Sequence, residues 1–204
     1  MNTLTTAASG TDVSTVWVML RTTGIVAILI LTLGTVIGIA SPAIRNPRRR
    51  LVSISMHTAA SATGVLLLIG HIILAVADSY IAISPLAVVV PGIADWQPMW
   101  VGVGTVSLDL MLLIVLTSLN RLRAPRLWKR VHLLSYVALG LAWLHAMFAG
   151  TDASSRPMQL AAGVSLVAVA LAVVFRQSRA PQNPVSPSPP TPRVRETDYA
   201  GSSS

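Results

Sequence analysis

Apolar residues gather in five long runs, and short polar or proline-containing segments separate these runs. The runs extend from about Val16 to Ala40, Leu51 to Ala77, Met99 to Leu119, Leu127 to Phe148 and Pro157 to Phe175. A stretch of about 18 or more mostly apolar residues predicts a helix that crosses a membrane. We therefore expect an all-α, polytopic membrane helix bundle of about five transmembrane helices, occupying residues 16–176 as one domain.

The segments outside the runs have a different character. Residues 1–15 are polar and predict a loose outer tail, and residues 177–204 are rich in Pro and Ser and predict a disordered cytosolic tail. The segment Asp78 to Pro98 is partly apolar but is interrupted by prolines and Gly92, so it is too broken to span. We expect it to lie in the membrane interface as a lid over the outer end of the bundle.

Charge indicates the orientation of the bundle. The formal net charge is +8. Basic residues concentrate in Arg45 to Arg50, in Arg121 to Arg130 and in Arg176 to Arg195, whereas Asp12, Asp78, Asp95 and Asp152 fall in the alternate segments. This pattern predicts a cell-membrane protein with its N-terminus outside and its C-terminus in the cytoplasm. It explains the charge by membrane topology and not by nucleic-acid binding, and it leaves a docking surface for an acidic cytosolic partner as a second use.

All four histidines lie inside apolar runs: His57 and His71 in the second, His132 and His145 in the fourth. Both runs enter the membrane from the inside, so one histidine of each lies near the inner face and one near the outer face. Separations of 14 and 13 residues place these two levels about 20 Å apart. Such residues cannot surround one metal ion, whose ligands lie within about 2.1 Å. A planar tetrapyrrole that takes one histidine on each face fits two facing helices; the alternative is core histidines bonded to neighbouring side chains.

The two runs differ in how their histidines align. His57 and His71 fall on one stripe of a straight helix, among small residues that leave room for a flat macrocycle. The 13-residue spacing of His132 and His145 rotates a straight helix by about 140°. Either Gly140 marks an irregularity, or two haems approach this helix from different sides.

The two histidine pairs, together with the stretches LRTTG (residues 20–24) and LDLMLLIVLTSLNR (residues 108–121), resemble the ferric reductase-like transmembrane domain family. This family includes the membrane parts of NADPH oxidases and ferric reductases, and the haem-binding membrane subunit of the bacterial methionine-sulfoxide-reducing system. The resemblance covers about residues 16–150. It implies two b-type haems, with His57 pairing with His132 and His71 pairing with His145.

Two features depart from the family pattern. Relatives often have six spans, whereas five are predicted here. Ferric reductases and NADPH oxidases also carry flavin- and nicotinamide-binding modules, whereas the short tail of this chain has no Gly-rich phosphate loop. We therefore expect the chain to bind no flavin or nicotinamide alone.

Two charged residues within the runs are further candidates. Arg21 lies one turn inside the first run and either binds the propionates of the outer haem or extends to the lipid headgroups. Asp109 lies near mid-membrane and either relays protons and tunes a haem or is a neutral packing residue.

The function expected from these features is transmembrane electron transfer, which makes the chain the membrane component of an oxidoreductase. A cytosolic flavin reductase or a membrane quinol is the expected donor, and an external molecule such as a ferric chelate, oxygen or a partner reductase is the expected acceptor. An anchor for a periplasmic reductase differs from this only in the acceptor. The alternative from another class is a haem-free membrane scaffold or transporter subunit.

Overall fold

The computed structural model describes residues 6–79, 81, 83–150 and 154–179. The elements of this part of the chain are all helical: α1 (Thr6–Ala40), η1 (Ser41–Ala43), α2 (Pro47–Ala77), η2 (Pro85–Val88), α3 (Pro98–Leu119), α4 (Pro125–His132), α5 (Leu134–Phe148) and α6 (Arg156–Ser178). With α4 and α5 counted as one span, five segments are long and apolar enough to cross a membrane. The chain is therefore an all-α, multi-pass membrane helix bundle.

Several helix ends differ from the predicted positions. α1 begins at Thr6, so residues 6–15 continue a helix where a loose tail was expected; extending a formed helix adds one hydrogen bond for each residue fixed. α2 begins at Pro47, because the side chain of Asn46 accepts a hydrogen bond from the backbone N–H of Arg49 (3.2 Å) and proline suits the first helical turn. The helix thus begins four residues before Leu51, where the apolar run begins.

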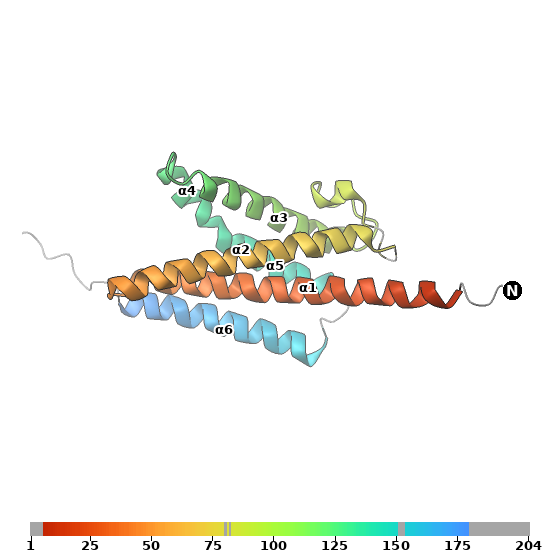
Figure 1. Ribbon diagram of the computed structural model, residues 1–204, viewed down its shortest axis with the longest axis horizontal. Helices are drawn as coiled ribbons and strands as arrows, with labels where there is room; N and C mark the ends of the chain where they lie inside the picture. The colour runs from red at the N-terminus through yellow and green to blue at the C-terminus, as the bar shows by residue number, and fades with distance from the viewer. Residues whose placement is uncertain (1–5, 80, 82, 151–153, 180–204) are drawn as a thin grey trace, which may run out of the picture.

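The bundle has two distinct ends. The C-terminus of α1, the N-terminus of α2, the α3–α4 loop and the C-terminus of α6 all lie at one end (Figure 1). We call it the basic end, because its loops and helix ends carry most of the arginines. The segment 78–97 lies at the opposite end, which we call the lid end. Each of α1 and α3 therefore runs between the same two ends as α2, in the opposite direction.

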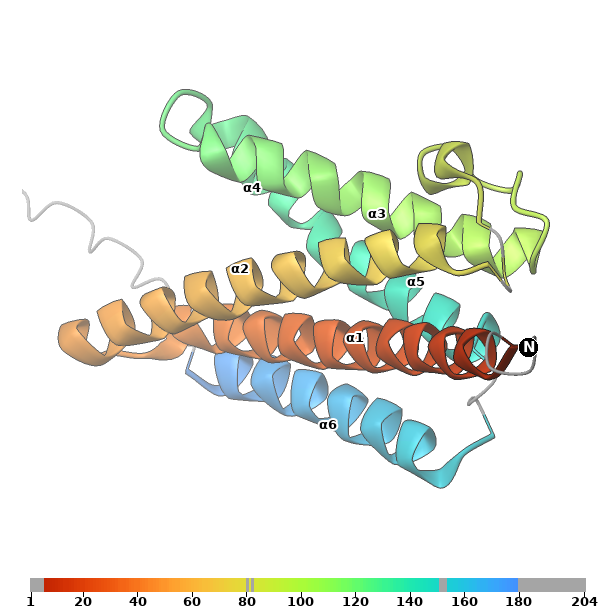
Figure 2. The ribbon, with the colours of Figure 1, turned by 45° about the vertical axis from the view of Figure 1, so that its right-hand side comes forward.

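Close backbone packing forms two groups of helices, which have α5 in common. α1 packs against α2, α5 and α6, and α3 packs against α4 and α5. The histidine-bearing helices α2 and α5 do not form such a closely packed pair. Figures 1 and 2 both show α2 diverging from the α3–α4 hairpin towards the basic end.

Small residues bring α1 and α2 together. A Cβ atom placed on Gly64 would lie 2.7 Å from the side chain of Leu31, and one placed on Gly34 would lie 3.2 Å from Oγ of Ser61. Small residues at such a contact allow two membrane helices to approach closely. This packing aligns α1 along the whole stripe of α2 that carries His57 and His71.

The fourth span is interrupted, and the interruption is not at Gly140. α4 ends at His132 and α5 begins at Leu134, with Leu133 as a turn between them. Gly140 lies inside α5, and a Cβ atom placed on it would have no neighbour within 4 Å. The break at Leu133 lies between His132 and His145.

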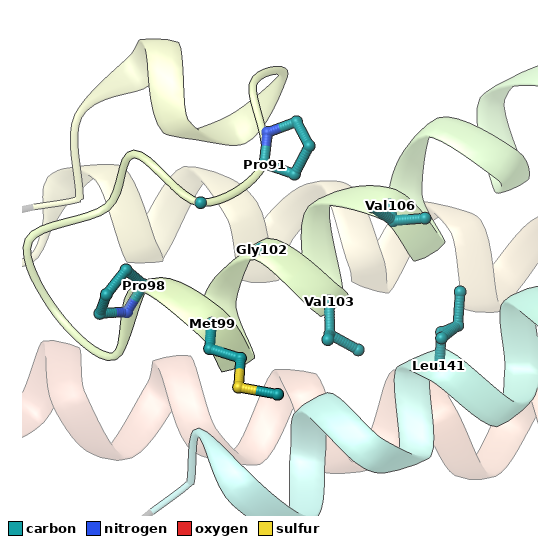
Figure 3. Close-up of a pocket in the computed structure, with 8 residues that line it drawn as sticks. Pro91, Pro98, Met99, Gly102, Val103, Val106 and Leu141 are labelled. Carbon is teal, nitrogen blue, oxygen red and sulfur yellow. The ribbon is translucent and has the colours of Figure 1, made fainter.

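The segment between α2 and α3 folds over the lid end without spanning. The carbonyl of Ala87, in η2, accepts a hydrogen bond from Oγ1 of Thr105 on α3 (2.8 Å). Further along the segment, Gly92 has a positive φ of 85° and lies so close to α3 that a Cβ atom on Gly102 would come within 2.7 Å of its backbone nitrogen. Figure 3 shows the loop at Pro91 lying over Gly102 of α3. Both residues line an apolar hollow of about 300 Å³.

Candidate functional site

Three of the four histidines bond to the backbone of a neighbouring helix. These bonds join Nδ1 of His57 to the carbonyl oxygen of Gly34 (2.8 Å), Nδ1 of His71 to that of Leu20 (2.9 Å) and Nδ1 of His145 to that of Trp100 (2.8 Å). The first two acceptors belong to α1, and the third belongs to α3. A side chain on one helix is thus tied in each case to the main chain of another.

A glycine accompanies each of these bonds, always four residues after the accepting carbonyl. Cβ atoms placed on Gly38, Gly24 and Gly104 would lie 3.0 Å, 2.8 Å and 2.5 Å from ring atoms of His57, His71 and His145, respectively. In an α-helix, the carbonyl of residue i points towards residue i+4, so a side chain at i+4 would obstruct a ring that approaches this oxygen. The glycines therefore make room for the three imidazoles.

The bonds determine where each ring carries its proton. A carbonyl oxygen only accepts hydrogen bonds, so Nδ1 must be the N–H donor and a neutral ring keeps its lone pair on Nε2. Histidines that bind metals commonly donate their second ring N–H to a backbone carbonyl in this way, which orients the ring and raises its basicity. His57, His71 and His145 are thus arranged to offer Nε2 as a ligand.

The basic end brings His57 and His132 together. Their ring centroids lie 6.1 Å apart and their planes are inclined by 83°. A ligand bound at the basic end could therefore reach both rings, one from α2 and one from α4.

The lid end brings His71 and His145 to one cavity of about 640 Å³. Its walls come from α1, α2, α3, α5, α6 and the segment between α2 and α3, which we call the lid segment, and they include Gly24 and Gly104 beside the two rings. Sites for organic ligands and cofactors commonly measure about 300–1,000 Å³ and are mostly apolar with a few polar groups. The lid-end cavity has this size and character.

Arg21 lines the same cavity. Its guanidinium lies 4.1 Å from the centroid of the Trp17 ring, one turn earlier on α1. This stacking holds a fixed positive charge beside the cavity that contains His71 and His145. The position suits a carboxylate-bearing ligand, because the planar guanidinium can donate two parallel hydrogen bonds to a carboxylate.

Asp109 lies elsewhere. Its side chain is exposed on α3 and lines neither of the two cavities described above. The structure does not bring it to the histidines, so its proton-relay or tuning role remains a sequence-based prediction. Trp143 of α5 instead joins the helices at mid-bundle: its Nε1 donates to Oγ1 of the buried Thr32 on α1 (3.2 Å).

Sequence reasoning identified the histidines but missed the groups that orient them. The accepting carbonyls are main-chain atoms, and no side-chain pattern marks them. Glycines facing the predicted histidine stripe would have been a usable signal, because Gly24, Gly38 and Gly104 occur in runs that were predicted to be helical.

Within the residues that the structure describes, no group of three or more His, Cys, Asp or Glu side chains could hold a metal ion. A metal held by protein side chains alone therefore has no candidate site there, whereas a macrocycle needs only two axial ligands from the protein. No model of a known protein family, no characterised protein and no solved structure matches this chain.

Proposed function

We propose that this chain is a di-haem b-type membrane cytochrome that passes electrons across the membrane. His57 and His132 hold one haem at the basic end, and His71 and His145 hold the other at the lid end. The observation that carries this proposal is the bond from Nδ1 of three histidines to a helix carbonyl over a glycine. If these histidines served only in packing, there would be no reason for three of them to bond a helix carbonyl through Nδ1 and so keep the lone pair of Nε2 available.

The residues at both levels fit such a group. At the basic end, the ring centroids of His57 and His132 lie 6.1 Å apart, so both side chains could reach one haem. At the lid end, the 640 Å³ cavity receives both His71 and His145, and Arg21 lies at its wall to bind the haem propionates. The accepting residues Leu20 and Gly34 are 14 positions apart on α1, which separates the two levels by about 21 Å.

Haem irons with two histidine ligands supply reversible one-electron transfer when bound. The chain holds the imidazoles in the ligating orientation through the three carbonyl bonds. The lid segment closes the lid-end cavity through contacts such as the hydrogen bond from Thr105 of α3 to the carbonyl of Ala87. The close α1–α2 packing keeps the two levels at a fixed separation.

The basic end is the cytoplasmic end in this proposal, because arginine-rich loops favour the cytoplasmic side. Electrons then enter at His57 and His132 from a separate flavoprotein or from a membrane quinol. They leave at His71 and His145 to an external acceptor, such as a ferric chelate, oxygen or a partner reductase.

A pyridine haemochrome assay on the purified protein tests the proposal. We expect two haem b per chain, and a well-folded protein without haem would overturn the proposal in favour of a scaffold or transporter subunit. His71→Ala should leave one haem, because it removes an axial ligand at the lid end only. Tyr136→Ala is the matched control, since it removes an exposed ring of α5 that does not line the cavity; loss of haem in both variants, or in neither, would refute the ligand assignment.

A further inference from the structure

His132 differs from the other three histidines in its surroundings. Its Nδ1 is buried and has no hydrogen-bond partner among the described residues. None of the glycines in this part of the chain would place a Cβ atom against its ring. The carbonyl-and-glycine arrangement that orients His57, His71 and His145 is therefore missing at His132.

The aromatic neighbour of His132 offers the wrong kind of polar group. Trp128 lies one turn earlier on α4, with its ring centroid 5.4 Å from that of His132. Its Nε1 is a donor only, and it too is buried without a partner in the described structure. When Nε2 of a histidine binds a metal, Nδ1 carries the proton and needs an acceptor, which an indole N–H cannot supply.

The position of His132 in its helix is also less constrained. It is the last residue of α4, directly before the break at Leu133. His57, His71 and His145 lie within continuous helices and are bonded to a second helix. Helix ends have fewer main-chain hydrogen bonds than helix interiors, so the ring of His132 can move with less loss of structure.

We propose that His132 is the displaceable axial ligand, so that the basic-end site binds a small neutral diatomic molecule, such as carbon monoxide, in its place. The exchange would break the bond that Nε2 of His132 would make to the iron of a bound haem, and would form one to the carbon of the incoming molecule, without transfer of an electron or a proton. The lid-end site keeps both of its histidines, because each is bonded to a carbonyl. This inference rests on the proposed function, since it requires a haem at each level.

Carbon monoxide binding to the dithionite-reduced protein tests the inference. We expect a carbon monoxide difference spectrum that accounts for one of the two haems. A double variant with His71→Ala and His145→Ala leaves the basic-end site alone, and its remaining haem should bind carbon monoxide. The converse variant, His57→Ala with His132→Ala, should retain the lid-end haem, and this haem should not bind carbon monoxide.

A pair of substitutions at Trp128 tests whether His132 is displaceable because its Nδ1 lacks an acceptor. Trp128→Gln provides an amide oxygen one turn from His132, within reach of its Nδ1, whereas Trp128→Leu removes the indole without adding an acceptor. We expect the carbon monoxide affinity to fall about tenfold in Trp128→Gln relative to Trp128→Leu, the effect of one added hydrogen bond.

The outcomes separate the two proposals. Two haems per chain with no carbon monoxide adduct, or an adduct confined to the lid-end site, would overturn the inference and leave the proposed function intact. Equal carbon monoxide affinity in Trp128→Gln and Trp128→Leu would overturn the role assigned to Nδ1 of His132. A protein without haem would overturn the proposed function and this inference together.

Discussion

Replacing Gly104 by alanine should disable the lid-end site while leaving the bundle folded. The added Cβ atom would lie 2.5 Å from Nδ1 of His145, about 0.9 Å short of the 3.4 Å at which ordinary van der Waals contact begins. The ring must therefore move away from α3. Its hydrogen bond to the carbonyl of Trp100, now 2.8 Å long, is stretched or lost.

The size of the effect follows from these two losses. Overpacking of this kind costs about 1–3 kcal/mol, and one hydrogen bond contributes about 0.5–1.5 kcal/mol. Together they act against the present position of the His145 ring by about 1.5–4.5 kcal/mol. Since each 1.4 kcal/mol is a factor of ten, the affinity of the lid-end site for the proposed haem should fall by about 10- to 1,600-fold.

The assay is the ratio of haem to protein by pyridine haemochrome after purification. We expect two haems per chain in the parent protein and one in Gly104→Ala. Gly140→Ala is the control, because it makes the same change in α5 at a position where a Cβ atom would meet no neighbour within 4 Å. A Gly104→Ala protein that keeps both haems with the parent spectrum would refute the argument that this glycine makes room for the ring.

Five further substitutions, at four positions, test other parts of the site and of the bundle. Gly24→Ala should weaken haem binding at the lid-end site, and Gly38→Ala should weaken it at the basic-end site. Both effects should be smaller than that of Gly104→Ala, because the added Cβ atoms would lie 2.8 Å and 3.0 Å from the rings. Haem content after dilution ranks the three variants, and a reversed order would contradict the packing argument. Arg21→Gln should speed the transfer of one haem to apomyoglobin, with Arg21→Lys intermediate, and unchanged rates would exclude a propionate contact. Thr32→Val removes the acceptor for Trp143 and should lower the free energy of unfolding by about 1 kcal/mol, measured by thermal unfolding in detergent; no change would show that this bond contributes nothing.

Much of the fold could be predicted from the sequence because the membrane imposes a simple constraint. Backbone groups in lipid must bond internally, so a long apolar run has to be a helix. The runs ending at Ala40, Ala77, Leu119 and Phe148 end in the structure at those same residues. The N-terminal boundaries were less well predicted, as at Pro47, because capping by Asn46 extends a helix beyond its apolar stretch.

The candidate site was only partly predictable. The sequence placed His57 and His71 on one helical stripe, and the structure ties both to α1. An irregularity at Gly140 was one of two alternatives left open for the fourth span, and the interruption lies instead at Leu133. Glycine is a poor guide to helix breaks here, because Gly140 is accommodated inside α5 without any neighbouring atom nearby.

The sequence alone determined that the chain crosses the membrane repeatedly and that its histidines lie at two depths, because both follow from hydrophobic length and a fixed rise per residue. Only the tertiary structure decided which groups each histidine meets. Interhelical contacts depend on helix rotation and separation, which a run of apolar residues does not specify. For this reason the bonds of His57, His71 and His145 to carbonyls beside glycines, and the absence of such a bond at His132 within the described residues, emerge only in the assembled bundle.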